Sequence, residues 1–222
     1  MKKYILWIAI VFFGCSESNK ELPKILIIGD SIAGGYFPFV KKNLNGKAKV
    51  FQPTYYDKDG KTKSCCGGTS QGIKEIGIFL SDIKWDIIHF NFGLHDIKHI
   101  DPVTGKNSKN LNHPHQASPK EYERNLVEIV KKLKKTGAKL IFATTTPYPD
   151  KLGKQMRSPG MPKVYNEIAL RIMDKNEIKI NDLYSLVLPR INKLQRPNNV
   201  HFNSKGSEFL ATQVIKSIMD SI

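Results

Sequence analysis

Two short motifs near opposite ends of the chain contain residue types that can perform acyl transfer. Near the start, the apolar run Ile25–Ile28 ends in Gly29-Asp30-Ser31, and near the end Asn199-Val200-His201-Phe202 precedes a predicted helix. A serine hydroxyl is a weak nucleophile until an adjacent imidazole removes its proton. Such pairs are recognised by their geometry and not by their order along the chain. The sequence therefore predicts a hydrolase with Ser31 as nucleophile and His201 as general base.

The strands that would position these residues alternate with helical patterns. Near-continuous apolar runs of this kind are typical of a parallel sheet whose two faces are covered by helices. We therefore predict a single-domain three-layer α/β/α sandwich with a five-stranded parallel sheet. The expected strands are Lys24–Gly29, Ala48–Gln52, Asp86–Phe92, Leu140–Thr145 and Ile178–Asp182.

The clearest predicted helix runs from Pro119 to about Thr136. Ser118 is placed as its N-cap, Glu121 completes a capping box, and Gly137 ends it. Its apolar stripe is Leu126, Ile129, Val130 and Leu133. Further helices are expected at Phe37–Leu44, Gly72–Asp82, Lys163–Lys175, Tyr184–Leu194 and Ser204–Ser221.

The candidate residues follow the ends of the predicted strands. In open parallel sheets, ligands bind beyond the carboxyl ends of the strands. Ser31 follows the first strand, Gly67 and Gly68 follow the second, and His95 follows the third. His201 comes after the last strand and its helix, so all of them are expected to face one crevice. Two long polar loops, Asp101–Ala117 and Pro147–Pro162, are of a length that is usually functional or disordered.

From Lys24 to the C-terminus the chain resembles the SGNH (GDSL-type) hydrolase superfamily, which is characterised by four sequence blocks. Gly29-Asp30-Ser31 matches the first block, and Cys66-Gly67-Gly68-Thr69 holds the glycine of the second. The third is usually Gly-x-Asn-Asp, where this chain has Gly93-Leu94-His95-Asp96. The fourth is usually Asp-x-x-His, where this chain has Asn198-Asn199-Val200-His201. The resemblance implies a flavodoxin-like sheet and a covalent acyl–Ser31 intermediate.

The resemblance also implies an oxyanion hole, the set of N–H donors that binds the developing negative charge. The backbone N–H of Ser31, one from Gly67 or Gly68, and the imidazole of His95 would form it. The alternative to His95 is Asn91, whose side-chain amide could donate instead. Asp30 and Asp96 match family positions that are structural.

The third member of the catalytic triad departs from the family pattern. Asn198 stands where the family has its aspartate, and it has no charge to place beside the imidazolium. It could still orient His201 through its side-chain oxygen or its backbone carbonyl. Asp182, at the end of the fifth predicted strand, is the other candidate.

A second serine matches a different hydrolase motif. Gly68-Thr69-Ser70-Gln71-Gly72 has the Gly-x-Ser-x-Gly pattern of the α/β-hydrolase nucleophile elbow. That elbow requires a buried strand directly before it, whereas the residues before Gly68 are polar. We therefore favour Ser31 over Ser70.

The N-terminus has the pattern of a targeting segment. Lys2 and Lys3 precede the apolar run Tyr4–Phe13, which is too short to span a bilayer and is followed by Gly14-Cys15. We predict a signal peptide over residues 1–15 whose lipobox cysteine, Cys15, is lipidated, then a polar tether over 16–22 and the hydrolase domain over 23–222. The protein would be an envelope lipoprotein, periplasmic or on the outer surface. An ordinary secretory signal is the alternative.

The remaining cysteines and the histidines do not indicate a metal site. Cys65 and Cys66 are adjacent, so two free thiols are favoured over a strained bridge. The six histidines do not fall at zinc-ligand spacings. We expect no metal and no cofactor.

The charge of the chain favours acidic partners. Lys and Arg number 35 against 20 Asp and Glu, a net charge of +15. Basic surfaces attract acidic polymers, but no nucleic-acid-binding signature is present, so we expect no nucleic acid partner. An anionic polysaccharide is the better candidate, and a lysine-rich surface without a specific partner is the alternative.

Together these features predict a serine esterase that removes acyl groups, most simply acetyl, from carbohydrate. A lysophospholipase or thioesterase acting on lipid substrates is one alternative. An inactive carbohydrate-binding relative is the other, because the family's asparagine and aspartate are both replaced.

Overall fold

The computed structural model describes residues 21–56, 62–64, 67–150 and 157–222. Its main sheet has five parallel strands in the order β2-β1-β5-β6-β7, which confirms the predicted fold class. Each strand lies within its predicted range or within one residue of it. They are β1 (Lys24–Ile28), β2 (Lys49–Phe51), β5 (Ile87–Phe90), β6 (Lys139–Ala143) and β7 (Lys179–Asn181).

The central strands are buried because helices cover both of their faces. Ile25 to Ile28 of β1 are at most 1% exposed, and all four residues of β5 are buried. The rings of Phe90 and Phe142 on neighbouring strands meet edge to face, with centroids 5.4 Å apart. Strand order reverses between β1 and β5, and at such a switch point the loops diverge and leave a crevice.

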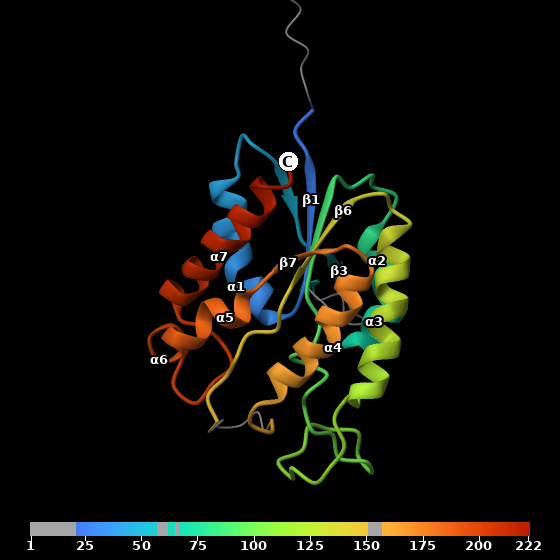
Figure 1. Ribbon diagram of the computed structural model, residues 1–222, viewed down its shortest axis with the longest axis vertical. Coiled ribbons are helices and arrows are strands. Elements are labelled where there is room, and N and C mark those ends of the chain that lie inside the picture. The colour runs from blue at the N-terminus through green and yellow to red at the C-terminus, as the bar shows by residue number, and fades with distance from the viewer. Residues whose placement is uncertain (1–20, 57–61, 65–66, 151–156) are drawn as a thin grey trace, which may run out of the picture.

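Two helical layers enclose the sheet (Figure 1). One layer holds α1 (Ser31–Asn43) against α7 (Ser204–Met219), together with α5 (Leu183–Val187) and α6 (Ile191–Leu194). The other holds α2 (Thr69–Leu80), α3 (Pro119–Lys134) and α4 (Met161–Lys175). None of the helices in the described part of the chain is long and apolar enough to cross a bilayer.

Helix α3 confirms the sequence prediction in detail. Ser118 accepts a hydrogen bond from the Glu121 N–H, and the Glu121 carboxylate accepts one from the Ser118 N–H. The predicted apolar stripe is buried against the core. A capping residue of this kind typically contributes about 1 kcal/mol to helix stability.

Helix α1 begins six residues earlier than the predicted Phe37–Leu44. Gly34, Gly35 and Pro38 are poor helix formers and conceal its start in the sequence. Asp30 caps the helix, because its carboxylate accepts a hydrogen bond from the Ile32 N–H at 2.8 Å. Gly35 allows close packing of α1 on α7, because a Cβ there would lie 3.1 Å from the Ser207 hydroxyl.

Two other segments differ from the prediction. The expected helix Tyr184–Leu194 is broken into α5, a 3-10 turn η1 (Leu188–Arg190) and α6, with Pro189 in the turn. A small antiparallel pair, β3 (Thr54–Tyr56) and β4 (Thr62–Ser64), was not predicted. The predicted signal peptide, Cys15, Cys65 and Cys66 lie outside the described residues.

Candidate active site

The serine and histidine of the two motifs lie side by side. Ser31 Oγ is 2.9 Å from His201 Nε2, although 170 residues separate them in the chain. Ser31 is the first residue of α1, directly after the buried strand β1, and its side chain reaches solvent. This separation is that of a nucleophile and its general base.

The far side of the imidazole is held by Asn199. The Oδ1 atom of Asn199 lies 2.7 Å from His201 Nδ1 and also accepts the His201 backbone N–H at 3.0 Å. An amide oxygen can only accept, so Nδ1 carries the proton and donates it to Oδ1. Nε2 is therefore the unprotonated nitrogen, and it can accept the proton of the Ser31 hydroxyl.

Neither of the orienting groups suggested by the sequence hydrogen-bonds to the His201 ring, whose Nδ1 partner is Asn199. Asn198 is exposed and has φ = +52°, a left-handed conformation that turns the chain just before Asn199. Asp182 caps α5 instead, where its carboxylate accepts hydrogen bonds from Thr144 Oγ1 and the Ser185 N–H. The sequence prediction was wrong on this point, because the bond is made two residues before the histidine and not three.

The loop that presents His201 is itself fixed by hydrogen bonds. Gln195 and Phe202 form an isolated β-bridge, and the Arg196 N–H donates to the His201 carbonyl at 2.9 Å. The Gln195 side chain donates to the Pro147 carbonyl at 2.6 Å, which ties this loop to the segment after β6. The histidine is therefore held against the carboxyl edge of the sheet without being on a strand.

The environment of His201 keeps its imidazole neutral near pH 7. Burial lowers the pKa of His201 from the ordinary 6.5. The Asp30 carboxylate raises it, whereas the positive charges of Arg196 and Arg157 lower it further. A neutral imidazole is the form that can act as a base.

The candidate backbone donors for an oxyanion are N–H groups at two helix starts. The first N–H groups of a helix have no partner within the helix, and Ser31 stands in that position on α1. The Gly67 N–H donates to Gln71 Oε1 at 3.1 Å, whereas no described residue accepts the N–H of Gly68. A Cβ on Gly68 would lie 2.7 Å from Asp96 Oδ1, so only glycine fits there. The geometry therefore favours Gly68 over Gly67.

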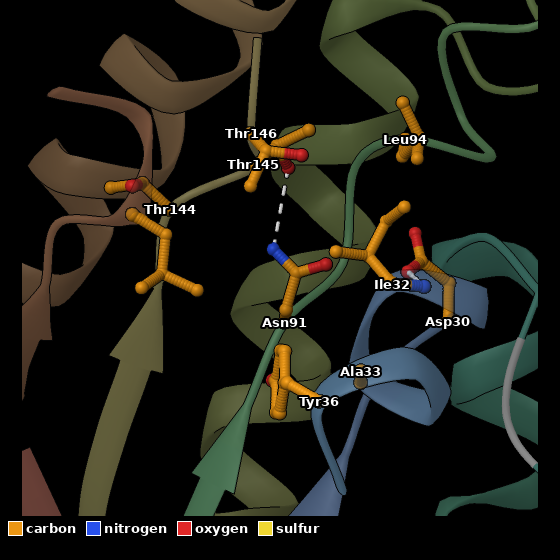
Figure 2. A pocket seen from close by; sticks show the side chains of 10 residues that line it. Asp30, Ile32, Ala33, Tyr36, Asn91, Leu94, Thr144, Thr145 and Thr146 are labelled. Carbon is orange, nitrogen blue, oxygen red and sulfur yellow. Dashed lines mark hydrogen bonds between the residues drawn. The ribbon is translucent and has the colours of Figure 1, made fainter. Parts of the chain in front are cut away.

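His95 is available as a donor and Asn91 is not. His95 lines the same pocket as Ser31 and His201. Burial is the main cause that lowers its pKa to about 4, so it is neutral and keeps one N–H. The Asn91 amide donates to the Ala143 carbonyl at 2.7 Å and to Thr145 Oγ1 at 3.3 Å. Figure 2 shows this side chain pointing from the end of β5 toward Thr145.

The pocket in front of the serine has a volume of about 140 Å³. Both long loops contribute to it: Asn107 and Ser108 from one, and Arg157 from the other. Sequence reasoning predicted that these loops were functional candidates but did not single out Arg157, which carries no recognisable motif. The lining residues are Ser31, Leu94, His95, Lys98, His99, Asn107, Ser108, Arg157, Val200 and His201.

Residues 27–209 match the GDSL-like lipase/acylhydrolase family. The chain belongs to this family. It is accordingly a serine ester hydrolase. None of the curated proteins compared with the chain matches it.

Solved structures of similar fold include a lipase/acylhydrolase and two esterases. A lipase/acylhydrolase from Enterococcus faecalis has a TM-score of 0.68 and 18% identity, covering 90% of this chain and 96% of its own. The acetyl xylan esterase AlAXEase has a TM-score of 0.62 and 17% identity, covering 88% and 99%. The esterase EstA from Pseudoalteromonas sp. has a TM-score of 0.63 and 14% identity, covering 89% and 97%. At these identities the likeness shows the fold.

Two aspartates at GDSL block positions have structural contacts in this chain. Asp30 caps α1. Asp96 is fully buried and accepts hydrogen bonds from both the N–H and the hydroxyl of Thr69, at 2.8 and 2.7 Å. Burial is the main cause that raises the pKa of Asp96 to about 6. Asp96 thereby braces the third block against the helix start of the second.

The rival serine, Ser70, lies in a different setting from the GDSL serine. It is in the first turn of α2 and accepts a hydrogen bond from Asn125 Nδ2 at 3.2 Å. No described histidine hydrogen-bonds to it. Because Gly68 is the N-cap of α2, Ser70 lies inside the helix and not on a turn between a strand and a helix, where a nucleophile elbow places its serine.

Proposed function

We propose that Ser31, His201 and Asn199 form the catalytic centre of an esterase that removes acetyl groups from carbohydrate. The observation that carries the proposal is the pair of hydrogen bonds on the imidazole. Nε2 lies 2.9 Å from the serine hydroxyl and Nδ1 lies 2.7 Å from the Asn199 oxygen. One nitrogen is thus a base directed at the nucleophile while the other is held by an acceptor.

The proposed reaction has two halves. Ser31 Oγ attacks the ester carbonyl as Nε2 of His201 takes the hydroxyl proton, and the carbonyl oxygen becomes an oxyanion. The N–H groups of Ser31 and Gly68 and the imidazole of His95 are the donors that would stabilise it. Collapse breaks the ester bond, and the imidazolium gives its proton to the leaving alcohol oxygen. Water then attacks the acyl–Ser31 ester by the same route and releases the acid.

The size of the pocket supports a short acyl group. A volume of about 140 Å³ lies below the roughly 300–1,000 Å³ that is usual for pockets that take drug-sized ligands. An acetyl group adds only two carbons to the attacked ester, whereas a lipid acyl chain would need a long apolar channel. The lysophospholipase and thioesterase alternatives are therefore less well supported.

The carbohydrate half of the proposal depends on the charge of the chain and on its N-terminus. A net charge of +15 favours an anionic polysaccharide. A lipid on Cys15 would hold the enzyme at the cell envelope, where such polymers occur. Loss of palmitate labelling and release from the membrane fraction in a Cys15→Ser variant would support this location. A wild-type protein without lipid would rule the anchor out.

Hydrolysis of nitrophenyl acetate, butyrate and octanoate by the purified domain tests the proposed function, together with acetate release from acetylated polysaccharides. We expect the rate to fall steeply beyond the acetate and butyrate esters, and acetate to be released from a polysaccharide. A preference for octanoate would favour the lipid hydrolases. Absence of hydrolysis of any of the three esters would favour the inactive binding protein.

A further inference from the structure

In the proposed reaction His201 takes a proton without a carboxylate hydrogen-bonded to its ring. Nδ1 faces the amide oxygen of Asn199, and Nε2 faces the Ser31 hydroxyl. An amide oxygen can orient the imidazole, but it carries no charge to stabilise the imidazolium that forms. In a Ser–His–Asp triad that charge comes from a buried aspartate. A negative charge elsewhere in the site would therefore assist the reaction.

Asp30 is a buried carboxylate directly before the nucleophile. It is 5% exposed, and its Oδ1 accepts the Ile32 N–H at 2.8 Å. Among the described residues Asp30 forms no ion pair. Consecutive Cα atoms are about 3.8 Å apart, and Ser31 Oγ is 2.9 Å from His201 Nε2. The carboxylate and the imidazole therefore lie on either side of the same serine.

The capping role of Asp30 does not require its charge. Asparagine and serine cap helices about as well as aspartate does. Burying a carboxylate is costly unless positive charge nearby compensates it. The N-terminus of α1 supplies part of that compensation, but a neutral cap would avoid the cost altogether. The helix therefore explains the hydrogen bond of Asp30 but not its negative charge.

The surroundings of the carboxylate are poor in water. Asp30 and Leu94 line one small cavity, and Leu94 also lines the pocket that holds Ser31 and His201. Figure 2 shows one Asp30 oxygen bonded to the start of α1 and the other pointing toward Leu94. Leu94 is itself buried. Charges in such surroundings are screened much less than charges on the surface, so the field of Asp30 reaches the neighbouring ring.

The charged groups around His201 have opposite effects on its pKa. Burial lowers that pKa, the Asp30 carboxylate raises it, and the charges of Arg196 and Arg157 lower it further. Burial is also the main cause that lowers the pKa of His95 and of Arg157, and the Asp30 carboxylate opposes it in both. Asp30 is therefore the carboxylate that counteracts the two arginines at the imidazole.

We propose that the Asp30 carboxylate stabilises the His201 imidazolium through space, so that Asn199 orients the ring while Asp30 supplies the negative charge. This inference rests on the proposed function, because it concerns the proton that His201 takes from Ser31. The proton moves from Oγ to Nε2 and later to the leaving alcohol, and Asp30 neither gains a proton nor touches the substrate. Asp30 is thus a positioning residue that acts through the histidine.

Asp30→Asn removes the charge and keeps the cap, because an asparagine oxygen can also accept the Ile32 N–H. Without the carboxylate the imidazolium is less stable, so the pKa of His201 falls. The base acts when it is unprotonated, so the lower limb of the pH–rate profile should move to lower pH by about 0.5–1 unit. A weaker base takes the serine proton less readily, so kcat should fall by about three- to tenfold with KM unchanged.

Hydrolysis of nitrophenyl acetate across the acidic range measures the limb, kcat and KM. Asp182→Asn is the matched control, because it removes the same charge from the N-cap of another helix. It should leave the limb and kcat as they are in the wild type. A limb that Asp30→Asn leaves in place, or moves to higher pH, would overturn the inference and leave the proposed function intact.

Asp30→Ala separates the charge from the cap. It removes both, so it should move the limb as far as Asp30→Asn does and should also lower the melting temperature, which Asp30→Asn should hardly change. A lower melting temperature in Asp30→Ala without any movement of the limb would show that Asp30 is a helix cap only.

A titration without turnover tests the inference even if the protein hydrolyses none of the esters. The Cε1–H signal of His201 in the proton NMR spectrum, assigned by its loss in His201→Gln, reports the pKa of the ring. We expect a lower pKa in Asp30→Asn than in the wild type, and an unchanged one in Asp182→Asn. Equal pKa values in the wild type and Asp30→Asn would contradict the inference, whatever the enzyme hydrolyses.

Discussion

The proposed nucleophile and the proposed base of this enzyme are positioned by two different kinds of structure. Ser31 stands where the buried strand β1 passes directly into α1, with Asp30 as a local cap. His201 stands in a loop between α6 and α7 that is held by side-chain and backbone hydrogen bonds. Sheet topology therefore fixes the serine, whereas a few polar contacts fix the histidine.

This difference between the supports of Ser31 and His201 predicts how each residue responds to substitutions around it. A residue at the end of a buried strand cannot move without displacing the core. A loop residue depends on single hydrogen bonds, and the loss of one typically costs about 1–3 kcal/mol when it leaves a buried group unpaired. We therefore expect the serine to be indispensable and the orientation of the histidine to be adjustable by one substitution.

The largest loss of activity is expected from replacing Ser31, which follows the end of β1. Ser31→Ala should reduce kcat by roughly 10⁶, as loss of a catalytic serine does elsewhere. Because the Ser31 side chain is exposed, the melting temperature should hardly change. Ester hydrolysis and thermal unfolding measure the two quantities. Ser70→Ala is the matched control and should keep most activity. Substantial activity in Ser31→Ala would refute the assignment.

The next effect concerns His95, the proposed third oxyanion donor. His95→Ala should lower kcat by about 10²- to 10³-fold, the usual loss for one such donor. His95→Asn, which restores the residue found at this position in the GDSL family, should recover most of the activity because an amide N–H can replace the imidazole N–H. If the alanine and asparagine variants are equally impaired, His95 has a structural role and not a donor role.

On the loop side we expect a smaller loss. Asn199→Ala should reduce kcat by about 10- to 100-fold, because the Nδ1–H of His201 loses its acceptor. Asn198→Gly, which tolerates the left-handed backbone, should have little effect on kcat.

Asp182→Ala should lower the free energy of unfolding by about 1 kcal/mol, because α5 loses its cap, and activity should be retained. A large kcat loss at Asp182 would show that a charged third member exists after all.

The smallest expected effect is a shift in the pH dependence of the rate when Asn199 is replaced by aspartate. Asn199→Asp would place a carboxylate against Nδ1 of His201, which favours the imidazolium and raises the histidine pKa. The base must be unprotonated to act, so the lower limb of the pH–rate profile should move to higher pH. Rates measured across the acidic range test this. An unmoved limb, or one that moves to lower pH, would show that residue 199 does not contact the ring in the active enzyme.

The contrast between strand ends and hydrogen-bonded loops also explains which features could be predicted from the sequence. The five strands of the sheet and the position of Ser31 follow from apolar runs, the first of which ends in Gly-Asp-Ser, because buried parallel strands leave a strong pattern. The start of α1 was missed because Gly34, Gly35 and Pro38 oppose the local helix propensity that tertiary packing overrides. The β3–β4 pair was missed because its strands are only three residues long.

Ser31, His201 and His95 line one pocket and could be singled out as candidates by their motifs and by the family resemblance, whereas Asn199 and Arg157 could not. Asn199 is chosen over Asn198 by backbone conformation, since φ = +52° at Asn198 turns the chain before the histidine. An asparagine that accepts the N–H two residues later is a common turn, and this offset was the available signal. Arg157 lines the pocket because of tertiary hydrogen bonds: its own to Leu94, and those of the next residue, Ser158, to His99 and Tyr148.

Covalent labelling of the wild-type protein tests the catalytic pair most directly. An organophosphonate reacts with the serine that an adjacent base activates, so the labelled peptide identified by mass spectrometry names the nucleophile. We predict one adduct per chain on Ser31, and none when His201 is replaced by alanine. An adduct on Ser70, or labelling of Ser31 that is unaffected by the loss of His201, would contradict the Ser31–His201 mechanism.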